Sequence, residues 1–394
     1  MLKIAFWASV GVVLYTYLGY PILICLLSKI RPAGCSVASP SASAAPRVTL
    51  IIPAYNEELW IERKIRNALA LDYPRDRMQI LVASDGSTDR TVEIARRFAE
   101  EGVEVAHFPG PAGKMTTLNR VMAQTGGEVV LLTDATALLE ADALRWLTPY
   151  FADSAVGCVA GDRACLATSS LATHGEGQYW RYEAWIKRSE SRYGSCLGAY
   201  GQLYAVRRSL FPFIPGTSDD FYVPMNILIS TGARTVFEPR ARASVPAAAT
   251  LPGEFRRKVR THVALFRELP RLSTGLIPWR SKIWWEFWSH HVLRLFVPWS
   301  MFTALGASAF LWSDGTAYQL AFWAQILLYA MAVIGLLLLL RKRKRGPAQP
   351  CFYFVFANVA VAVAWFEYLR GGNPYRWQRT ERLPDANREA KECR

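Results

Sequence analysis

Acidic and amide side chains stand at the ends of three apolar stretches, and any chemistry of this chain starts from them. The residues at these ends are Asn56, Glu57, Asp85 and Asp134. Each stretch is rich in β-branched residues, and helix-like sequence follows two of them, as in a parallel sheet with crossover helices. Ligands of such sheets bind outside the carboxyl ends of the strands. We therefore expect the four side chains to share one crevice with the layout of an active site.

The segments that position these side chains alternate between strand and helix patterns. After the strand that begins at Val48, strands are expected at residues 79–84, 103–108, 128–133 and 198–206. Helices are expected at residues 57–71, 115–124, 140–151, 175–192 and from 216–221 onward. Ser87 or Thr88 is expected to cap one more helix, which Gly102 ends. The predicted fold class is α/β, with a mostly parallel sheet.

Long uncharged runs lie outside this α/β region. Ile4–Leu27 has 24 residues without a charge and Tyr318–Leu340 has 23, whereas ~20 residues span a bilayer. Leu295–Trp312 and Cys351–Phe366 are shorter uncharged runs with flanking aromatic residues. We therefore expect an integral membrane protein with α-helical spans at both ends and the lipid bilayer as a partner.

The net charge of +14, from 46 basic and 32 acidic residues, is concentrated beside the apolar runs. Residues 341–345 are all basic and follow an apolar run, which is typical of the cytoplasmic end of a span. A second basic cluster, residues 256–260, precedes an aromatic stretch and suits an anionic membrane surface or a phosphate-bearing substrate. This distribution predicts no nucleic-acid partner.

Cysteine and histidine give no pattern of a structural metal site. The seven cysteines are an odd number without a Cys-x-x-Cys pair, so neither a disulfide framework nor a zinc site is expected. Glu286, His290 and His291 contain metal-ligating groups, but adjacent helical residues face apart. We expect residues 282–293 to lie along the membrane surface instead.

The patterns divide the chain into five parts. They are an N-terminal anchor at 1–30, a Ser/Ala/Pro linker at 31–46, an α/β domain at 47–282, an interfacial segment with about three spans at 283–370, and a basic tail at 371–394. The first apolar run is longer than that of a signal peptide, so we expect an uncleaved anchor although Ala42–Ala44 resembles a cleavage site. Lys29, Arg31 and Arg47 then place the domain in the cytoplasm.

Five short motifs in this order resemble family 2 glycosyltransferases. They are Pro53–Glu57, Ser84–Asp89, Gly113-Lys114 with Leu118-Asn119, Thr133-Asp134 and Ser218–Asp220. Within that family the chain resembles the membrane-bound, cellulose-synthase-like bacterial branch, from about Arg47 to Arg267. The resemblance implies a GT-A fold, a location in the bacterial inner membrane, and transfer of a sugar with inversion from a nucleotide-sugar, usually a UDP-sugar.

The resemblance also implies roles for single residues in binding the donor. It places Tyr55 and Glu57 near the nucleotide, and an Asp85 carboxylate can accept a hydrogen bond from a pyrimidine base. Lys114 suits a phosphate as a point charge. Arg260 falls at the place of the family's motif that contacts the donor phosphates or the acceptor entry.

Two acidic residues receive chemical roles from the same resemblance. Asp134 would hold ribose or a divalent cation, Mg²⁺ or Mn²⁺, because a leaving diphosphate needs its charge neutralised. Asp220 would be the general base that deprotonates the acceptor hydroxyl. Asp219 is then expected to cap the following helix. The alternatives without a role in catalysis or binding are a plain turn at Asp85-Gly86, helix caps at Asp219 and Asp220, and a solvated Lys114.

The chain departs from the family pattern at two places. Thr136 stands where metal-dependent members have the second acid of Asp-x-Asp, so the metal site lacks one carboxylate. Residues 257–261 keep Arg260 but lack the Gln and Trp of Gln-x-x-Arg-Trp, which occurs in processive polymerases. The second departure argues against synthesis of long chains.

Three functions remain in competition at this point. The first is a glycosyltransferase with a lipid-linked or growing glycan acceptor, active in surface-polysaccharide or glycolipid synthesis. The second is a processive synthase that also translocates its product, and the third is a non-catalytic nucleotide-binding scaffold or transporter. The topology is also open: three spans after a cytoplasmic domain put the C-terminus outside, yet residues 370–382 are basic. Either a segment within 283–312 or 351–369 does not cross, or the charge rule fails here.

Overall fold

The computed structural model describes residues 1–30, 45–165, 173–216, 218–246, 250–341 and 346–371. The greater part of the linker predicted at 31–46, with Ala42–Ala44, lies outside these residues. So does the predicted tail beyond Gly371.

A mixed eight-stranded sheet forms the centre of the described domain, in the order β3-β2-β1-β4-β7-β6-β8-β5. The strands are β1 (Val48–Ala54), β2 (Met78–Asp85), β3 (Val103–Phe108), β4 (Val129–Leu132), β5 (Leu138–Leu139), β6 (Val156–Cys165), β7 (Tyr204–Arg207) and β8 (Arg234–Val245). The first half, β3-β2-β1-β4, is parallel throughout. In the second half β7 pairs antiparallel with β4 and β6, and β5 pairs antiparallel with β8, whereas β6 and β8 are parallel. The predicted parallel arrangement therefore holds for the half that carries the first four motifs.

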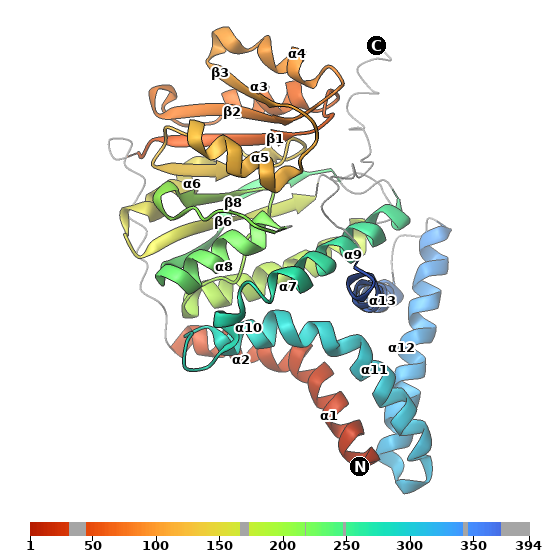
Figure 1. The fold of residues 1–394 in the computed structure, drawn as a ribbon. Helices are drawn as coiled ribbons and strands as arrows, with labels where there is room; N and C mark the ends of the chain where they lie inside the picture. The colour runs from red at the N-terminus through yellow and green to blue at the C-terminus, as the bar shows by residue number, and fades with distance from the viewer. Residues whose placement is uncertain (31–44, 166–172, 217, 247–249, 342–345, 372–394) are drawn as a thin grey trace.

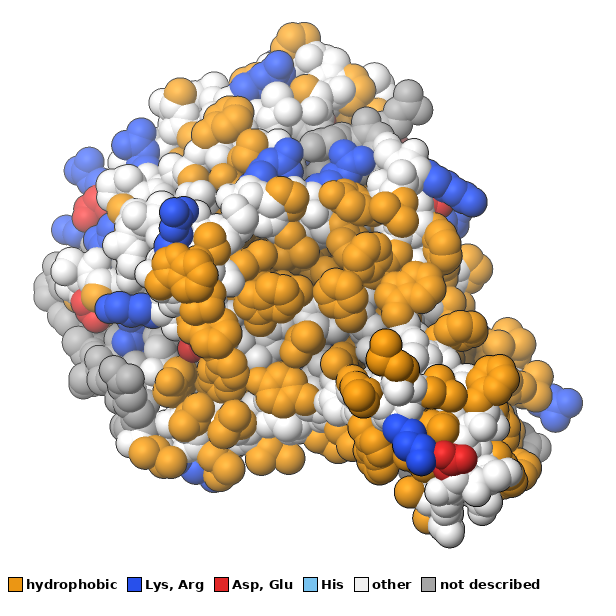
Figure 2. Space-filling view, turned by 60° about the horizontal axis from the view of Figure 1, so that its bottom comes forward, with side chains coloured by type: hydrophobic (Ala, Val, Ile, Leu, Met, Phe, Trp, Pro, Cys, Tyr) orange, Lys and Arg blue, Asp and Glu red, His pale blue; other side chains and the backbone are white. Residues whose placement is uncertain are grey.

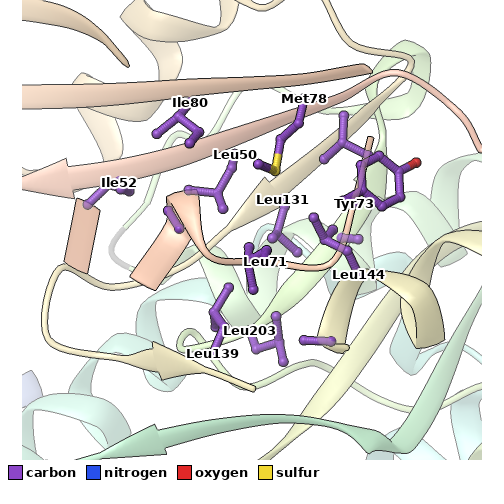
Figure 3. Close-up of a cluster of buried hydrophobic side chains, with 14 of the residues drawn as sticks. Leu50, Ile52, Leu71, Tyr73, Met78, Ile80, Leu131, Leu139, Leu144 and Leu203 are labelled. Carbon is purple, nitrogen blue, oxygen red and sulfur yellow. The ribbon is translucent and has the colours of Figure 1, made fainter. Parts of the chain in front are cut away.

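Helices cover both faces of the sheet because its central strands are buried on both sides. Every residue of β1 is buried, so its side chains alternate between two cores. One core packs against α3 (Ile61–Leu69), α4 (Thr91–Arg96) and α6 (Ala143–Leu147). Figure 3 shows Leu50, Ile80 and Leu131 of three neighbouring strands together in this core. The other core packs against α5 (Lys114–Val121) and α8 (Asp219–Thr231).

Two long helices form the underside of the domain, and apolar helices lie below them (Figure 1). The underside helices are α7 (Thr173–Tyr193) and α9 (Leu251–Glu268), and the lower helices are α1 (Leu2–Leu14), α2 (Tyr20–Ile30), α10 (Trp284–Phe287), α11 (Leu293–Phe310), α12 (Thr316–Leu340) and α13 (Ala348–Leu369). Within the described part of the chain, four helical stretches are long and apolar enough to cross a membrane: Leu2–Ile30, Trp284–Phe310, Thr316–Leu340 and Ala348–Leu369. Figure 2 shows hydrophobic side chains spread over this lower face.

π-helical turns interrupt two of these stretches at the same depth. Tyr15–Gly19 joins α1 to α2, and Trp288–Val292 joins α10 to α11. The two turns touch, because Tyr15 Oη lies 2.8 Å from Ser289 Oγ. Such turns are common where helices bend, and in Figure 1 the N-terminal helix changes direction between α1 and α2.

The last helix packs on α9 as well as on α12. Phe255 near the start of α9 packs on Phe356 in the middle of α13, and Phe266 packs on Tyr368 near the ends of both helices. In Figure 1, α13 is seen along its axis while α12 runs down the page. The apolar composition of α13 therefore does not by itself make it a crossing helix.

Several local predictions differ from the structure. The helix expected at 57–71 begins only at Ile61, because Asn56 has a φ of 54° and the chain turns before the helix starts. The strand expected at 198–206 is reduced to Tyr204–Arg207. Neither Ser87 nor Thr88 caps α4, whose N-cap is Arg90. Instead, Asp89 Oδ1 accepts a bond of 3.0 Å from the backbone nitrogen of Thr91.

The segment expected along the membrane surface has one side against α7, while Trp284 and Trp288 are exposed, and its place at the membrane surface stays a prediction. His290 is only 1% exposed. The prediction that His290 and His291 face apart is wrong, because the π-helical turn stacks their rings with centroids 4.4 Å apart.

Close packing of α12 on α13 gives a test of this arrangement. A Cβ at Gly335 would lie 2.3 Å from the backbone oxygen of Ala348, whereas one at Gly306 on α11 meets nothing within 4 Å. Small residues allow apolar helices to approach this closely. Gly335→Val should therefore destabilise the protein by about 1–3 kcal/mol, measured by thermal unfolding in detergent. Gly306→Val is the matched control, and equal loss in both variants would contradict this packing.

Candidate functional site

Lys114 joins the strand-end acid Asp134 to the acid at the start of α8. Its Nζ atom lies 3.1 Å from Asp134 Oδ1 and 3.0 Å from Asp219 Oδ1. Burial acts to lower the pKa of Lys114, but the two carboxylates outweigh it and the pKa is raised above its ordinary value. Lys114 is therefore a fixed positive charge between two parts of the chain, and not a solvated lysine without a role in the site.

Asp85 holds the loop that carries Lys114. Its Oδ1 atom accepts bonds of 2.9 Å from Ala112 N and 2.8 Å from Thr117 Oγ1, and its Oδ2 accepts one of 2.8 Å from Gly113 N. The next residue, Gly86, has a φ of 68°, and a Cβ there would lie 2.6 Å from the backbone of Gly110. The Asp85-Gly86 pair thus orients the start of α5. Its contact with a pyrimidine base stays a prediction.

The first two motifs are linked to each other at the same edge of the sheet. Asn56 Oδ1 accepts a bond of 2.8 Å from Thr88 N, and Glu57 N donates to Thr91 Oγ1 over 2.7 Å. The side chains of Tyr55 and Glu57 are half-buried. The structure thus brings Tyr55 and Glu57 to the loop that follows β2, while their contact with a nucleotide stays a prediction.

Asp134 is fixed from two further sides. Gln202 Nε2 donates to Asp134 Oδ2 over 3.3 Å. Below it, Lys64 of α3 is fully buried and donates to Thr133 Oγ1 over 2.8 Å and to Ala137 O over 2.5 Å. Burial lowers the pKa of Lys64 to about 7, opposed by the charge of Asp134.

Sequence reasoning missed Lys64, although a signal was present. It lies three residues after Ile61 and one before Ile65, on the apolar face of α3. A lysine at such a position needs polar partners inside the domain. The oxygens of Thr133 and Ala137 are those partners, and they hold the loop that carries Asp134.

The pair Asp219-Asp220 opens α8, and its two carboxylates have different surroundings. Asp219 accepts a bond of 2.9 Å from Tyr204 Oη in addition to its ion pair with Lys114. Asp220 accepts bonds of 2.6 Å from Ser218 Oγ and 3.1 Å from Gly201 N. The prediction that Asp219 caps the helix is wrong, because the N-cap is Ser218 and Asp219 is the first helical residue.

Burial and the charge of Asp219 raise the pKa of Asp220 above its ordinary value. Ser218 and Lys114 oppose this shift by stabilising the ionised form. A carboxylate that holds a proton more tightly is a stronger base once ionised. Asp220 is therefore suited to accept a proton from a hydroxyl near neutral pH.

Arg260 lies half-buried on α9, and Arg256, one helical turn earlier, is exposed. Arg257, between them, forms an ion pair of 2.7 Å with the buried Glu254. The site role predicted for Arg260 stays a prediction.

The described residues hold no group of three or more His, Cys, Asp or Glu side chains that could bind a metal ion. Thr136 Oγ1, at the place of the second acid of Asp-x-Asp, is buried without a hydrogen-bond partner. Mg²⁺ is commonly held by one or two carboxylates, with substrate phosphates and water as further ligands. Asp134 therefore fits a divalent cation that arrives with a phosphate-bearing ligand, rather than a metal cage made by the protein alone.

Comparison with known proteins identifies a family domain within this chain. Residues 49–212 match the model of glycosyl transferase family 2. These residues form a family 2 glycosyltransferase domain. The domain contains the strand-end acids Asp85 and Asp134 and also Lys114, while Asp219 and Asp220 follow it directly.

Curated relatives match this domain over part of their length. A β-monoglucosyldiacylglycerol synthase of Synechocystis is 33% identical over 148 residues, 36% of this chain and 31% of that protein. A poly-β-1,6-N-acetyl-D-glucosamine synthase of Staphylococcus aureus is 27% identical over 223 residues, 54% of this chain and 53% of that protein. The chain thus spans about a third to a half of the length of the curated relatives it matches.

A solved structure matches nearly the whole chain. A mannosyltransferase from Pyrobaculum calidifontis, solved with GDP-mannose and Mn²⁺, is 25% identical, with a TM-score of 0.70 over 95% of this chain and all of that chain. The α/β region is therefore a GT-A glycosyltransferase fold, as the motifs implied. Assignment to the cellulose-synthase-like branch stays a prediction.

Removing the central cation tests the electrostatics of the site. In Lys114→Met, Asp134 and Asp219 lose their shared counter-ion, and we expect a loss of about 1–3 kcal/mol in the free energy of unfolding. Uncompensated carboxylates bind protons more readily in the folded state, so the loss should grow as the pH rises from 5 to 8. Thermal unfolding at several pH values measures it.

Arg145→Met is the matched control. It removes an exposed ion pair of 2.7 Å with Asp72, which should contribute under about 1 kcal/mol. A loss in Lys114→Met that is small and independent of pH would contradict this electrostatic account.

Proposed function

We propose that this chain is a membrane-bound, inverting glycosyltransferase. It moves a sugar from a nucleoside-diphosphate sugar to a hydroxyl of a lipid-linked or growing glycan acceptor, in glycolipid or surface-polysaccharide synthesis. The observation that carries this proposal is Lys114, whose ammonium lies within 3.1 Å of both Asp134 and Asp219. Lys114 thereby connects two parts of the site. One is the strand-end crevice, which suits a phosphate-bearing donor, and the other is the loop that presents a candidate base.

The donor half of the site consists of the strand-end loops. Tyr55, Glu57 and Asp85 flank the nucleotide, and Lys114 binds the diphosphate as a point charge. A divalent cation held by Asp134 would supply charge neutralisation to the leaving diphosphate. We expect UDP as the nucleotide, but the mannosyltransferase solved with GDP-mannose makes GDP the second nucleotide to test.

The acceptor half of the site is built around Asp220. Ser218 and the backbone of Gly201 each bind one oxygen of its carboxylate and so fix its orientation. The base takes the proton of the acceptor hydroxyl as the oxygen attacks the anomeric carbon, and the bond to the diphosphate breaks on the opposite side. A single displacement of this kind inverts the configuration at that carbon.

The lower helices support a lipid-linked acceptor and a location in the bacterial inner membrane. Large apolar side chains are exposed on α1, α11 and α12, including Ile4, Phe302 and Leu327. The underside of the domain rests on these helices, so an acceptor anchored in the bilayer would reach the site from below. The relatives named as a glycolipid synthase and a polysaccharide synthase agree with both acceptor classes.

The direction of α13 supports a cytoplasmic domain with a cytoplasmic tail. Lys3 and Asp314 form an ion pair of 2.8 Å at the ends of α1 and α11 remote from the domain. Arg267 on α9 lies 3.5 Å from the carbonyl of Gly371, just after α13. With α13 packed on α9, the end of α12 and Gly371 lie on the side of the domain, and a cytoplasmic domain then agrees with the positive-inside rule for the basic residues that follow each of them in the sequence. In this proposal the positive-inside rule needs no exception.

Substituting the two acids of α8 separates chemistry from binding. Asp220→Asn should preserve nucleotide-sugar binding and lower transfer by about 10²–10⁴-fold, because the base is lost. Asp219→Asn should retain most of the rate. Because the charge of Asp219 raises the pKa of Asp220, the acid limb of the pH–rate profile of Asp219→Asn should move to lower pH than in the wild type.

The assay uses membranes, labelled UDP- and GDP-sugars, and analysis of the lipid extract. Reversed phenotypes would make Asp219 the base. Absence of transfer and of donor hydrolysis with every donor would favour the non-catalytic scaffold, and a long polymeric product would favour the processive synthase.

Chelation tests the proposed cation. Excess EDTA should abolish transfer and Mn²⁺ or Mg²⁺ should restore it, because one lysine does not balance a diphosphate. Excess EDTA should also weaken the binding of the free nucleotide. Full activity in chelator would mean that Thr136 marks a metal-independent site.

A further inference from the structure

A cluster of charged side chains is buried where the domain meets the lower helices. Glu190 of α7 accepts a bond of 2.6 Å from Tyr20 Oη, and the same oxygen lies 2.6 Å from His290 Nδ1. His290 Nε2 lies 3.2 Å from Glu183, whose other oxygen pairs with Arg294. Both ring nitrogens of His290 thus lie within hydrogen-bond distance of carboxylate oxygens.

Such a cluster needs a role other than stability. Buried ion pairs lose in desolvation much of what they gain by attraction, and apolar residues of similar volume are often as stable. Charged groups beside membrane helices are correspondingly rare and mark functional positions. The question is therefore what else these side chains contact.

The second oxygen of Glu190 leads from the cluster toward the site. It accepts a bond of 3.3 Å from the backbone nitrogen of Leu197. Lys187, one turn earlier on α7, donates to Leu197 O over 3.3 Å and to Gly198 O over 3.0 Å. His291 Nε2 also lies 3.3 Å from Leu197 O. Residues Leu197–Tyr204, here called the connector segment, are thus held at their start by α7 and by the π turn Trp288–Val292.

The other end of the connector segment contacts all three acids of the site. Gly201 N donates to Asp220, Gln202 to Asp134, and Tyr204 Oη to Asp219. The backbone of Ala199 also donates to Asp220 O over 2.7 Å. The fit leaves little freedom, because a Cβ at Gly201 would lie 3.2 Å from Asp220 Oδ2.

We propose that Glu190 is a positioning residue for the transfer reaction. Through Glu190, the N-terminal helix and the π turn Trp288–Val292 hold the connector segment. The connector segment in turn orients Asp220. This inference rests on the proposed function. It explains why a carboxylate, with two oxygens, stands at Glu190: one oxygen binds the helices below and the other binds the segment above. Rotation of the Asp220 carboxylate would then follow any loss of the bond to Leu197.

Kinetics of Glu190 variants in the full-length protein test this inference. Glu190→Ala should lower kcat by roughly 10- to 100-fold while the donor KM changes by less than about threefold, because misplacement of the base acts on the chemical step. Glu190→Gln keeps an acceptor oxygen for Leu197 N and should recover most of kcat. Glu183→Gln is the matched control: it alters the same cluster at a carboxylate that binds His290 and Arg294, and it should leave kcat unchanged.

Amide hydrogen exchange gives a readout that does not require activity. Exchange of residues 197–204 should increase in Glu190→Ala and stay at the wild-type level in Glu183→Gln. Equal kcat and equal exchange in Glu190→Ala and wild type would overturn the inference. If Glu190→Ala and Glu183→Gln lost kcat and stability to the same extent, the role of Glu190 would be purely structural, and this result would also overturn the inference. If the wild type transfers no sugar, the proposed function fails, and exchange alone decides whether Glu190 holds the segment.

Discussion

The two ion pairs of Lys114 are the interaction on which the site depends. Asp134 belongs to the loop after β4, and Asp219 belongs to the start of α8, 85 residues later in the sequence. Without a cation between them, these acids and Asp220 would repel one another across a partly buried space. Lys114 therefore turns a repulsive arrangement into a stable one, and it does so at the place where a diphosphate would bring further negative charge.

The rest of the domain holds this arrangement from three directions. Asp85 orients the start of α5 and with it Lys114. Lys64 fixes the loop of Asp134 from inside the core. The connector segment binds the acids from the side of the lower helices. Asp85 and Lys64 are buried polar groups with hydrogen bonds inside the protein, which makes the positions of the acids specific.

Local patterns predicted the part of the site that lies at strand ends. The strand at 103–108 has the predicted bounds, and Asp85 and Asp134 end or follow strands as expected, because apolar runs and their polar ends are visible in a single stretch of sequence. The role of Asp219 was not predictable in this way. Its partners Lys114 and Tyr204 are distant in the sequence, so only the folded chain shows that the helix cap is Ser218 instead.

Contacts between the domain and the lower helices were also beyond the sequence patterns. Helical spacing predicted that His290 and His291 face apart, but a π turn changes the spacing and stacks them. The central claim is that Lys114 binds the donor diphosphate beside Asp134 while Asp220 faces the anomeric carbon. An experimental structure with a non-hydrolysable nucleotide-sugar and Mn²⁺ tests it most directly. The account predicts phosphate oxygens within hydrogen-bond distance of Lys114 and the sugar between them and Asp220; a diphosphate bound away from Lys114 would contradict it.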